Sequence, residues 1–451
     1  MITKLLTEVK DGEIFRFPDK EAKTYGQNGR RETWHPEVFQ GDGSPLYYVE
    51  GGRPFDAAYG TSANGGGVSS MAPGKTPVEV VENVTDLMDY SNVRGTRQLM
   101  KPNQSTGTDP EIFVTRGVAR KTLLPAFKFL PTKAEAKKAF TGTITGAYGY
   151  RDGFAAEAYI GARSCHGYLM DTIRAGLQKI RSAARDYDRT AELTIQNTFT
   201  VPAITMQHAT DEEVELGCKP SLNAYGDIVS QPTDPRGFRL RFAGGHVHLG
   251  LGSSLEARRH RDHFVEDMVR GCDLIAGVTS VAMLEGVDDP RRRMYYGRAG
   301  DYRLTEYGSG SEYSSTPMCG LEYRVLSNAW LAHPKFAHLT LNLVRVGLKI
   351  GNLRMAGTMG LQPEEVQEII NYCDVPKARK WVNSHFDLLV TLLTGDGCGM
   401  YPTKAREAFK LAVNESMPAL FKNYADLKRN WRLESSWTLH SNNSAETWAN
   451  V

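Results

Sequence analysis

Hydrophobic and polar positions change their spacing twice along the chain, which divides it into three parts. In residues 1–104, thirteen glycines and scattered prolines interrupt short apolar pieces, a texture typical of irregular structure. Thr76 and Pro77, followed by apolar residues at helical spacing, predict a single helix over about 76–88. We therefore expect residues 1–104 to form a loop-rich N-terminal extension.

Residues 105–332 combine short β-like segments with helical stretches. The predicted strands are 112–115, 193–200, 238–242, 246–251 and 321–326. Apolar residues recur at helical spacing over roughly 166–187 and 255–284, which predicts two long helices. Helices inserted between strands at irregular intervals favour an α+β fold with an antiparallel sheet.

Residues 333–451 are predicted to form a helical C-terminal region. The periodic runs are 336–350, 363–372, 376–393 and 403–430. At roughly 150 residues per domain, a chain of 451 residues corresponds to about three domains. We therefore expect boundaries near 104/105 and 332/333, with no internal repeat.

The charge of the chain is nearly balanced. Lys and Arg number 54 against 52 Asp and Glu, which gives a formal net charge of +2. This balance argues against a protein that coats nucleic acid. Hydrophobic residues make up 41% of the chain, which is enough for a folded interior and excludes wholesale disorder.

Two features concern the cellular compartment. The longest nearly apolar stretch, 274–284, is far shorter than the roughly 20 residues of a membrane-spanning helix, and the N-terminus lacks the apolar centre of a signal peptide. The six cysteines lie far apart without a C-x-x-C pair, so we expect reduced thiols and no structural zinc site. The sequence predicts a cytoplasmic protein that does not bind membranes.

Asp109 and Glu111 flank Pro110 at the start of a predicted strand. Side chains two residues apart on a strand share a face, so the carboxylates are expected side by side, where a cation would offset their repulsion. An Asp-Pro turn followed by an exposed acid fits the same residues. Both interpretations remain open at this point.

His246 and His248 occupy one face of a short predicted strand, with glycines on both sides. Glycines allow a ligand to approach the backbone closely, and imidazoles bind metals or phosphate. Two buried histidines satisfied by hydrogen bonds are the alternative. The pattern therefore indicates a candidate ligand site.

Arginines gather downstream in the segment 291–303, and Glu322 with Arg324 repeats the two-residue spacing on a later strand. Guanidinium groups match phosphate oxygens in geometry, so this segment suits a polyphosphate. A solvated charged loop and an ordinary cross-strand ion pair are the alternatives. If the strands share a sheet, the acids, histidines and arginines together predict a metal–nucleotide site.

Six motifs occur in a fixed order over residues 105–332. They are Gly107-Thr-Asp-Pro-Glu-Ile-Phe, Asp152-Gly-Phe-Ala-Ala-Glu, Leu216-Gly-Cys-Lys-Pro-Ser-Leu-Asn-Ala, Gly244-Gly-His-Val-His-Leu-Gly, Tyr296-Gly-Arg-Ala-Gly-Asp-Tyr-Arg and Gly320-Leu-Glu-Tyr-Arg-Val-Leu-Ser-Asn-Ala-Trp. Together they resemble the phage-encoded carboxylate-amine ligase family (COOH-NH2 ligase, amidoligase type 2), which belongs with glutamine synthetase and glutamate-cysteine ligase.

The resemblance implies a curved antiparallel sheet backed by helices, the glutamine synthetase-like catalytic fold, which binds ATP and two or three Mg²⁺ or Mn²⁺ ions. The residues it implies as metal ligands are Asp109, Glu111, Glu157, His246 and Glu322. Those implied as nucleotide contacts are His248, Arg293 and Arg298, with Arg303 and Arg324 as catalytic groups. The catalytic domain is then 105–332, flanked by regions that match nothing we can name.

The expected reaction joins a carboxylate to an amine. The carboxylate attacks the γ-phosphoryl group of ATP and forms an acyl phosphate, and the amine then displaces phosphate. The substrates are expected to be small molecules or peptides, nucleic acid entering only as a modified nucleotide. A homo-oligomer is possible because relatives often assemble, and a phage-encoded enzyme would act in the host cytoplasm.

Two other classes of function remain open. A metal-dependent hydrolase also uses carboxylates with a His-x-His pair to hold a metal-bound water, but it has no need for the arginines. A virion or scaffold protein that retains the fold as a binding module is the other alternative. The absence of an acidic residue from the predicted metal site would favour the scaffold protein, but all of these acids are present in the sequence.

Overall fold

The computed structural model describes most of the chain beyond residue 104 and short segments before it. Of the first 104 residues it describes 2–5, 8, 14–16, 34–39, 45–49 and 77–81. Beyond them it describes 105–434 except 119–120, 141–146, 164–165, 215–220, 227–233, 253–263, 308–317, 353–355, 395–402, 417 and 419–424. Among the residues described, no helix is long and apolar enough to cross a membrane.

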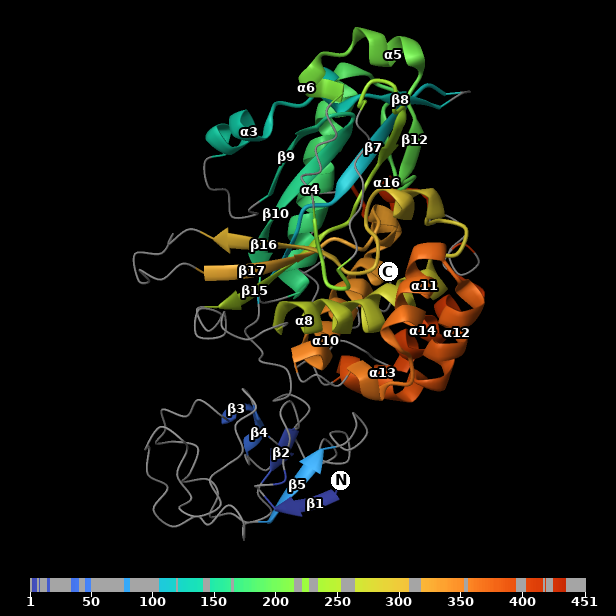
Figure 1. The fold of residues 1–451 in the computed structure, drawn as a ribbon. Coiled ribbons are helices and arrows are strands. Elements are labelled where there is room, and N and C mark those ends of the chain that lie inside the picture. Colours follow the sequence, from blue (N-terminus) through green and yellow to red (C-terminus); the bar gives the residue numbers. More distant parts are fainter. Residues whose placement is uncertain are drawn as a thin grey trace.

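The described segments before residue 82 form a five-stranded antiparallel sheet (Figure 1). In spatial order its strands are β1 (Ile2–Leu5), β5 (Pro77–Val81), β2 (Ile14–Arg16), β4 (Pro45–Val49) and β3 (Trp34–Phe39). The helix predicted over 76–88 is wrong where the structure describes it, because Pro77–Val81 is a strand. Three valines among these five residues favour an extended backbone, and pairing with β1 and β2 engages the backbone groups of this strand. The rest of 76–88 lies outside the described residues.

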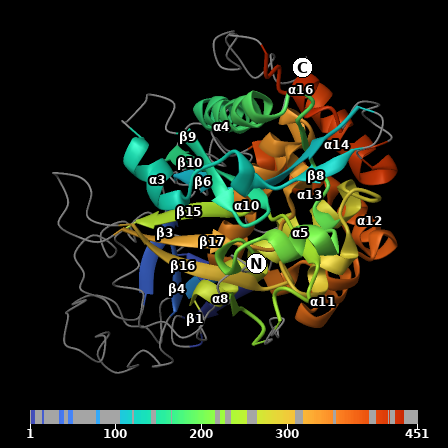
Figure 2. The ribbon, with the colours of Figure 1, turned by 90° about the horizontal axis from the view of Figure 1, so that it is seen from above.

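A ten-stranded antiparallel sheet dominates residues 105–323 and confirms the predicted α+β class. In chain order its strands are β6 (Thr106–Thr108), β7 (Glu111–Arg116), β8 (Thr122–Leu124), β9 (Ala147–Asp152), β10 (Ala155–Arg163), β11 (Glu192–Thr194), β13 (Leu222–Asn223), β15 (Val247–Gly252), β16 (Asp301–Tyr307) and β17 (Met318–Tyr323). Figure 2 shows β10, β6, β15, β17 and β16 side by side in this order. The sheet is strongly twisted, since β7, β9 and β10 run steeply in Figure 1 while β15, β16 and β17 run nearly across it.

One predicted strand, 193–200, is two strands in the structure. After β11, the chain leaves the large sheet and forms β12 (Thr198–Thr200), which pairs with β14 (Leu240–Phe242) in a separate two-stranded sheet. The other four predicted strands overlap β7, β14, β15 and β17. Local alternation thus located these strands, but it missed others, including β10 and β16, and did not show where the chain changes sheets.

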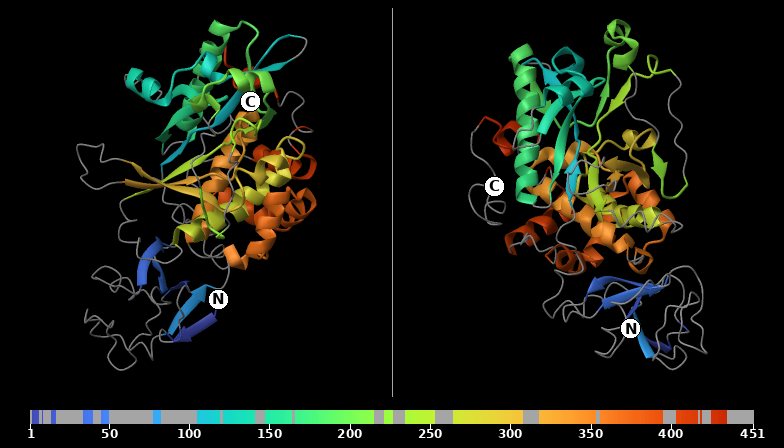
Figure 3. Two further views of the ribbon diagram at one scale, coloured as in Figure 1. Left: turned by 45° about the horizontal axis from the view of Figure 1, so that its top comes forward. Right: turned by 90° about the vertical axis from the view of Figure 1, so that its left-hand side faces the viewer.

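Helices cover one face of the large sheet. The helix α4 (His166–Tyr187) has the predicted bounds and lies along β9 and β10 (Figure 3), while α8 (Phe264–Cys272) contacts β17 and α10 (Pro334–Asn352) contacts β15. The α4 side chains at helical spacing are fully buried: Leu169, Ile173, Leu177 and Ile180. Among the residues described before 264, the other α-helices are α3 (Lys133–Ala139), α5 (Ala203–His208) and α6 (Asp211–Val214).

The C-terminal region is helical, as predicted, and shares the hydrophobic core of the sheet. Where the structure describes this region, its further α-helices are α11 (Pro363–Tyr372), α12 (Val375–Ser384), α13 (Phe386–Thr394), α14 (Thr403–Glu415) and α16 (Leu427–Asn430). The predicted run 376–393 is broken at His385 into two helices. One continuous cluster of buried apolar residues extends from Ile112 to Leu433, so these helices pack onto the sheet instead of enclosing a separate core.

The predicted helix 255–284 is confirmed from residue 264 onward, with a π-helical segment at Asp273–Gly277 between α8 and α9 (Val278–Met283). Asp273 is fully buried. Its carboxylate accepts hydrogen bonds from the Tyr323 hydroxyl at 2.7 Å and from the Gly300 N–H at 2.6 Å. This acid therefore ties the helix layer to β17 and to the loop before β16.

Burial raises the pKa of Asp273 to about 7, compared with about 3.9 in an unfolded chain. The folded state then binds more protons between these values, so the free energy of unfolding is expected to fall as the pH rises from about 4 to about 7. At about 1.4 kcal/mol per pKa unit, the loss is at most roughly 4 kcal/mol. Asp273→Asn cannot ionise and should flatten this part of the stability curve. Denaturant unfolding across this pH range measures the effect, and parallel curves for both proteins would contradict it.

Candidate metal and phosphate site

Neighbouring strands carry most of the residues that the sequence singled out. His248 on β15 lies opposite Glu322 on β17, which in turn lies opposite Arg303 on β16. Glu157 on β10 lies opposite Glu111 on β7. Residues directly opposite each other in an antiparallel sheet point to the same face with Cβ atoms about 4.5–5.5 Å apart. The register therefore explains why these side chains meet.

This site faces away from the helix layer. Tyr323 points to the helices, because its hydroxyl donates to Asp273. Glu322 and Arg324 precede and follow it on the chain, and side chains alternate between the faces of a sheet. Glu322 and Arg324 therefore share the opposite face, where they contact each other.

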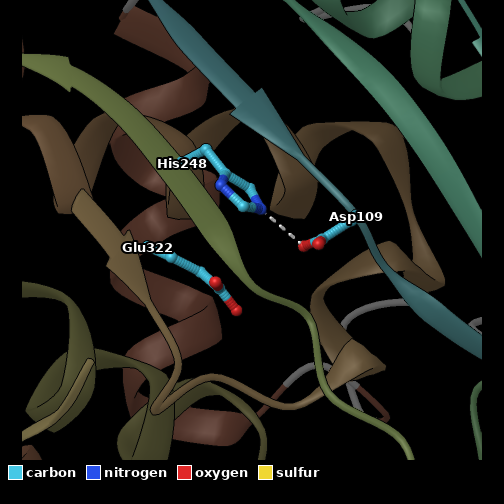
Figure 4. A group of neighbouring side chains, drawn as sticks. All are labelled: Asp109, His248 and Glu322. Atoms are coloured by element: carbon cyan, nitrogen blue, oxygen red, sulfur yellow. Dashed lines mark ion pairs between the residues drawn. The ribbon is translucent and has the colours of Figure 1, made fainter. Parts of the chain in front are cut away.

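Asp109, His248 and Glu322 form a group that can hold a metal ion. One ligand atom from each lies within 4.8 Å of the others, and His248 Nε2 lies 2.8 Å from Asp109 Oδ1 (Figure 4). Figure 4 shows the imidazole directed at the Asp109 carboxylate, with the Glu322 carboxylate beside them. Two carboxylates and an imidazole suit Mg²⁺ or Mn²⁺, so the donor set fits the cation that the resemblance implies.

Asp109 and His248 shift each other's pKa. Burial raises the pKa of Asp109, but His248 and His246 outweigh burial and hold it well below its usual range. Burial lowers the pKa of His248, but the Asp109 carboxylate outweighs burial and raises it. Both shifts favour a carboxylate beside a protonated imidazole, and a divalent cation bound to the two residues would replace the imidazole proton.

His246 lies beside this group on the same face. Its Nδ1 atom is 3.5 Å from Asp109 Oδ1 and 3.4 Å from Glu322 Oε1. The sequence interpretation made His246 a metal ligand and His248 a phosphate contact. In the structure, both imidazoles touch the same carboxylate, and His248 belongs to the metal-capable group. The roles of the two histidines remain predictions.

Glu111 and Glu157 bring two more buried carboxylates. Glu111 accepts hydrogen bonds from the Gly244 N–H at 2.7 Å and from the Tyr296 hydroxyl at 3.0 Å. Glu157 accepts from the Tyr150 hydroxyl and lies 3.7 Å from Lys133 Nζ. Burial, then the neighbouring Asp109 and Asp152, raise the pKa of Glu157 well above its usual range. The crowding of acids on this side favours a bound cation.

Two arginines approach from the opposite side of the group. The Arg324 guanidinium is buried and contacts Glu322 Oε1, while Arg303 Nη1 lies 3.7 Å from Glu322 Oε2. The Arg303 side chain is 30% exposed, so it can meet a ligand that enters from solvent. Acids therefore lie on the β10 and β7 side and guanidinium groups on the β17 and β16 side.

Arg298 and Arg293 lie in the segment that leads into β16. Arg298 is half-buried in a loop whose glycines, Gly297 and Gly300, have φ values of 68° and 84°, a conformation that favours glycine. Arg293 is buried, donates to Asp288 Oδ2 at 2.9 Å and contacts the carbonyls of Gly297 and Val325. Through these contacts Arg293 would fix the loop. They do not favour its predicted role in nucleotide binding.

Four residues in or beside the site carried no role in the sequence interpretation. They are Lys133, Tyr150, Asp152 and Tyr296, which contact or electrostatically influence the predicted acids. Burial, followed by the effect of Glu111, raises the pKa of Asp152 to about 7. Asp152 and Tyr296 are the first residues of two of the motifs. This place in the motifs is the one sequence signal that could have indicated these two residues. The motif residues 216–220 lie outside the described part of the chain.

Among the described residues, Cys272 and Cys373 have free thiols. Cys272 is fully buried, and burial raises the pKa of its thiol well above the usual range. A buried thiol with a raised pKa is a poor nucleophile. Cys272 is therefore an unsuitable catalytic residue.

No family model matches the chain, and no curated protein is similar to it. Similar solved structures include a chain of the complex between prokaryotic ubiquitin-like protein Pup and its ligase PafA. The identity is 11% and the TM-score 0.35, over 78% of this chain and 72% of that chain. A likeness of this size establishes neither a shared fold nor a shared activity.

Proposed function

We propose that the chain is an ATP-dependent ligase that joins a carboxylate to an amine. The observation that carries this proposal is the position of Arg303 and Arg324 beside the metal-capable group of Asp109, His248 and Glu322. A bound triphosphate is stabilised by a divalent cation and by guanidinium groups along its oxygens. A metal-bound water in a hydrolase requires no such arginines. The motif resemblance to carboxylate-amine ligases supports the same conclusion.

Asp109, His248 and Glu322 would hold Mg²⁺ or Mn²⁺, with Glu111, Glu157 and His246 as further ligands on the same face. Bound there, the cation would neutralise charge that the phosphates and the substrate carboxylate bring together. Burial, and after it the charges of Asp109 and Asp152, raise the pKa of Glu157, and a bound cation would oppose this rise by favouring the charged carboxylate. Residues 105–332 would form the catalytic unit, with 1–104 and 333–451 as flanking regions.

Arg303 and Arg324 would hold the oxygens of the γ-phosphoryl group. An oxygen of the substrate carboxylate attacks the γ-phosphorus and the bond to the β-phosphate oxygen breaks, which yields an acyl phosphate and ADP. The arginines stabilise the charge that develops on the transferred group. The amine then attacks the acyl carbon, and phosphate leaves as the amide bond forms.

The acidic side of the site would receive the amine. Burial and the neighbouring Glu111 raise the pKa of Asp152 to about 7, so its carboxylate can accept a proton from the amine near neutral pH. Lys133 has a side chain 61% exposed at the edge of this side and could contact a substrate carboxylate. The substrates would be a carboxylic acid and an amine, either small molecules or groups on a peptide.

Calorimetric titration of the full chain with ATP, in the presence and absence of Mg²⁺, tests the proposal. The proposal predicts ATP binding that depends on Mg²⁺ and release of ADP when suitable substrates are added. A protein that binds Mg²⁺ without any affinity for ATP would support the hydrolase instead.

A further inference from the structure

The Tyr296 phenol occupies the boundary between the acidic and the basic side of the site. The residue is 5% exposed. Its hydroxyl donates to Glu111 Oε1 at 3.0 Å and also contacts His246 Nε2. The guanidinium carbons of Arg292 and Arg324 lie 5.6 and 5.5 Å from the centre of its ring, at distances typical of cation–π interactions. The ring and the hydroxyl thus have separate partners.

The hydrogen-bonding capacity of this phenol constrains His246. A tyrosine hydroxyl has a single hydrogen to donate, and in this arrangement Glu111 accepts it. The hydroxyl can therefore only accept a hydrogen bond from His246 Nε2. The imidazole then carries a hydrogen on Nε2, which in the neutral ring leaves a lone pair on Nδ1.

The Nδ1 atom points at two carboxylates. Asp109 Oδ1 and Glu322 Oε1 lie 3.5 and 3.4 Å away, farther than the about 2.7–2.9 Å of a charge-assisted hydrogen bond. A nitrogen lone pair and two carboxylate oxygens that face one another repel unless a proton or a divalent cation lies among them. Metal-bound histidines in general donate their second N–H to a fixed partner, and Tyr296 occupies that partner's position.

Gly244 allows this contact to form. A Cβ atom added at Gly244 would lie 2.5 Å from His246 Nε2 and 2.8 Å from the Tyr296 hydroxyl oxygen. Both values are shorter than any normal contact of a side-chain carbon. Because Gly244 has no side chain, it leaves room for the contact between Tyr296 and His246.

We propose that Tyr296 is a positioning residue that holds His246 with its proton on Nε2, so that Nδ1, Asp109 and Glu322 together face a divalent cation. This inference rests on the metal site of the proposed function. It goes beyond that site because it assigns the tautomer of one ligand and the group that sets it.

Selective ¹⁵N labelling of histidine in the full chain, with His246→Gln to assign the signal, reports the tautomer directly. In wild-type protein loaded with Mg²⁺ we expect His246 to be protonated at Nε2 and unprotonated at Nδ1. Tyr296→Phe keeps the ring between Arg292 and Arg324 but removes the hydroxyl, so the signal should shift toward a mixture of tautomers. Mn²⁺ affinity, measured by electron paramagnetic resonance, should fall about 10–100-fold, the range found when a partner of a metal-bound histidine is removed.

Tyr302→Phe is the matched control, because the Tyr302 hydroxyl donates to Glu266 of the helix layer and should affect neither measurement. Equal Mn²⁺ affinity and an unchanged tautomer in Tyr296→Phe would overturn the inference while leaving the metal site intact. An unprotonated Nε2 in the wild-type spectrum would overturn it without any variant. Absence of Mn²⁺ binding by the wild type would overturn both the inference and the metal-dependent function.

Discussion

Replacing Arg303 or Arg324 with alanine is expected to lower turnover on the order of 10³-fold, the scale found for arginines that stabilise phosphoryl transfer. Both guanidinium groups adjoin Glu322, from β16 and from the chain just after β17. They would stabilise charge that appears only as the γ-phosphoryl group is transferred. Turnover should therefore fall more than the affinity for ATP.

ADP release measures this effect once an acid substrate is found. Hydroxylamine can replace the unknown amine while a panel of carboxylic acids is screened, because it attacks acyl phosphates generally. Arg185→Ala is the matched control, since Arg185 on α4 pairs with Glu192 away from the site and should keep wild-type turnover. If both site variants retained turnover within a few-fold of the control, the arginines would have no part in phosphoryl transfer.

Replacing Glu322 with alanine should have the second large effect, a loss of at least about 100-fold in Mn²⁺ affinity. Removing a group that only supports a ligand already lowers metal affinity about 10–100-fold, and Glu322 is itself in the metal-capable group. It also contacts Arg324 and lies near His246 and Arg303, so nucleotide binding should weaken as well.

Electron paramagnetic resonance of Mn²⁺ gives the affinity and the number of sites for this comparison. Glu192→Gln is the matched control, because Glu192 lies on β11 of the same sheet and pairs with Arg181 at 3.0 Å. Thermal unfolding of each variant separates a lost ligand from a lost fold. If a folded Glu322→Ala protein bound Mn²⁺ as tightly as the wild type, Glu322 would not be a metal ligand.

Local patterns predicted the features that depend on neighbouring residues along the chain. The spacing of apolar residues gave the bounds of α4, and two-residue spacing placed His246 with His248 and Glu322 with Arg324 on shared faces. These predictions succeeded because helical and strand periods are fixed by the backbone itself. The antiparallel sheet likewise followed from the irregular order of strands and helices.

Features that depend on distant partners were missed. Pro77–Val81 has a helical start signal, yet it forms a strand because it pairs with residues 2–5 and 14–16, and no local signal shows such partners. Tyr296 meets Glu111 and His246 across 185 and 50 residues of sequence. These contacts follow only from the folded arrangement, as do those of Arg293 with Asp288.

The most direct test of the proposed activity is the calorimetric titration of wild-type protein with ATP, with and without Mg²⁺, followed by an assay of ADP release with carboxylates and amines. The ligase predicts Mg²⁺-dependent ATP binding and substrate-dependent release of ADP, since the cation and the arginines together must hold the triphosphate. Binding of Mg²⁺ with no affinity for ATP, combined with cleavage of amides or phosphoesters in the absence of nucleotide, would contradict the account and identify a hydrolase.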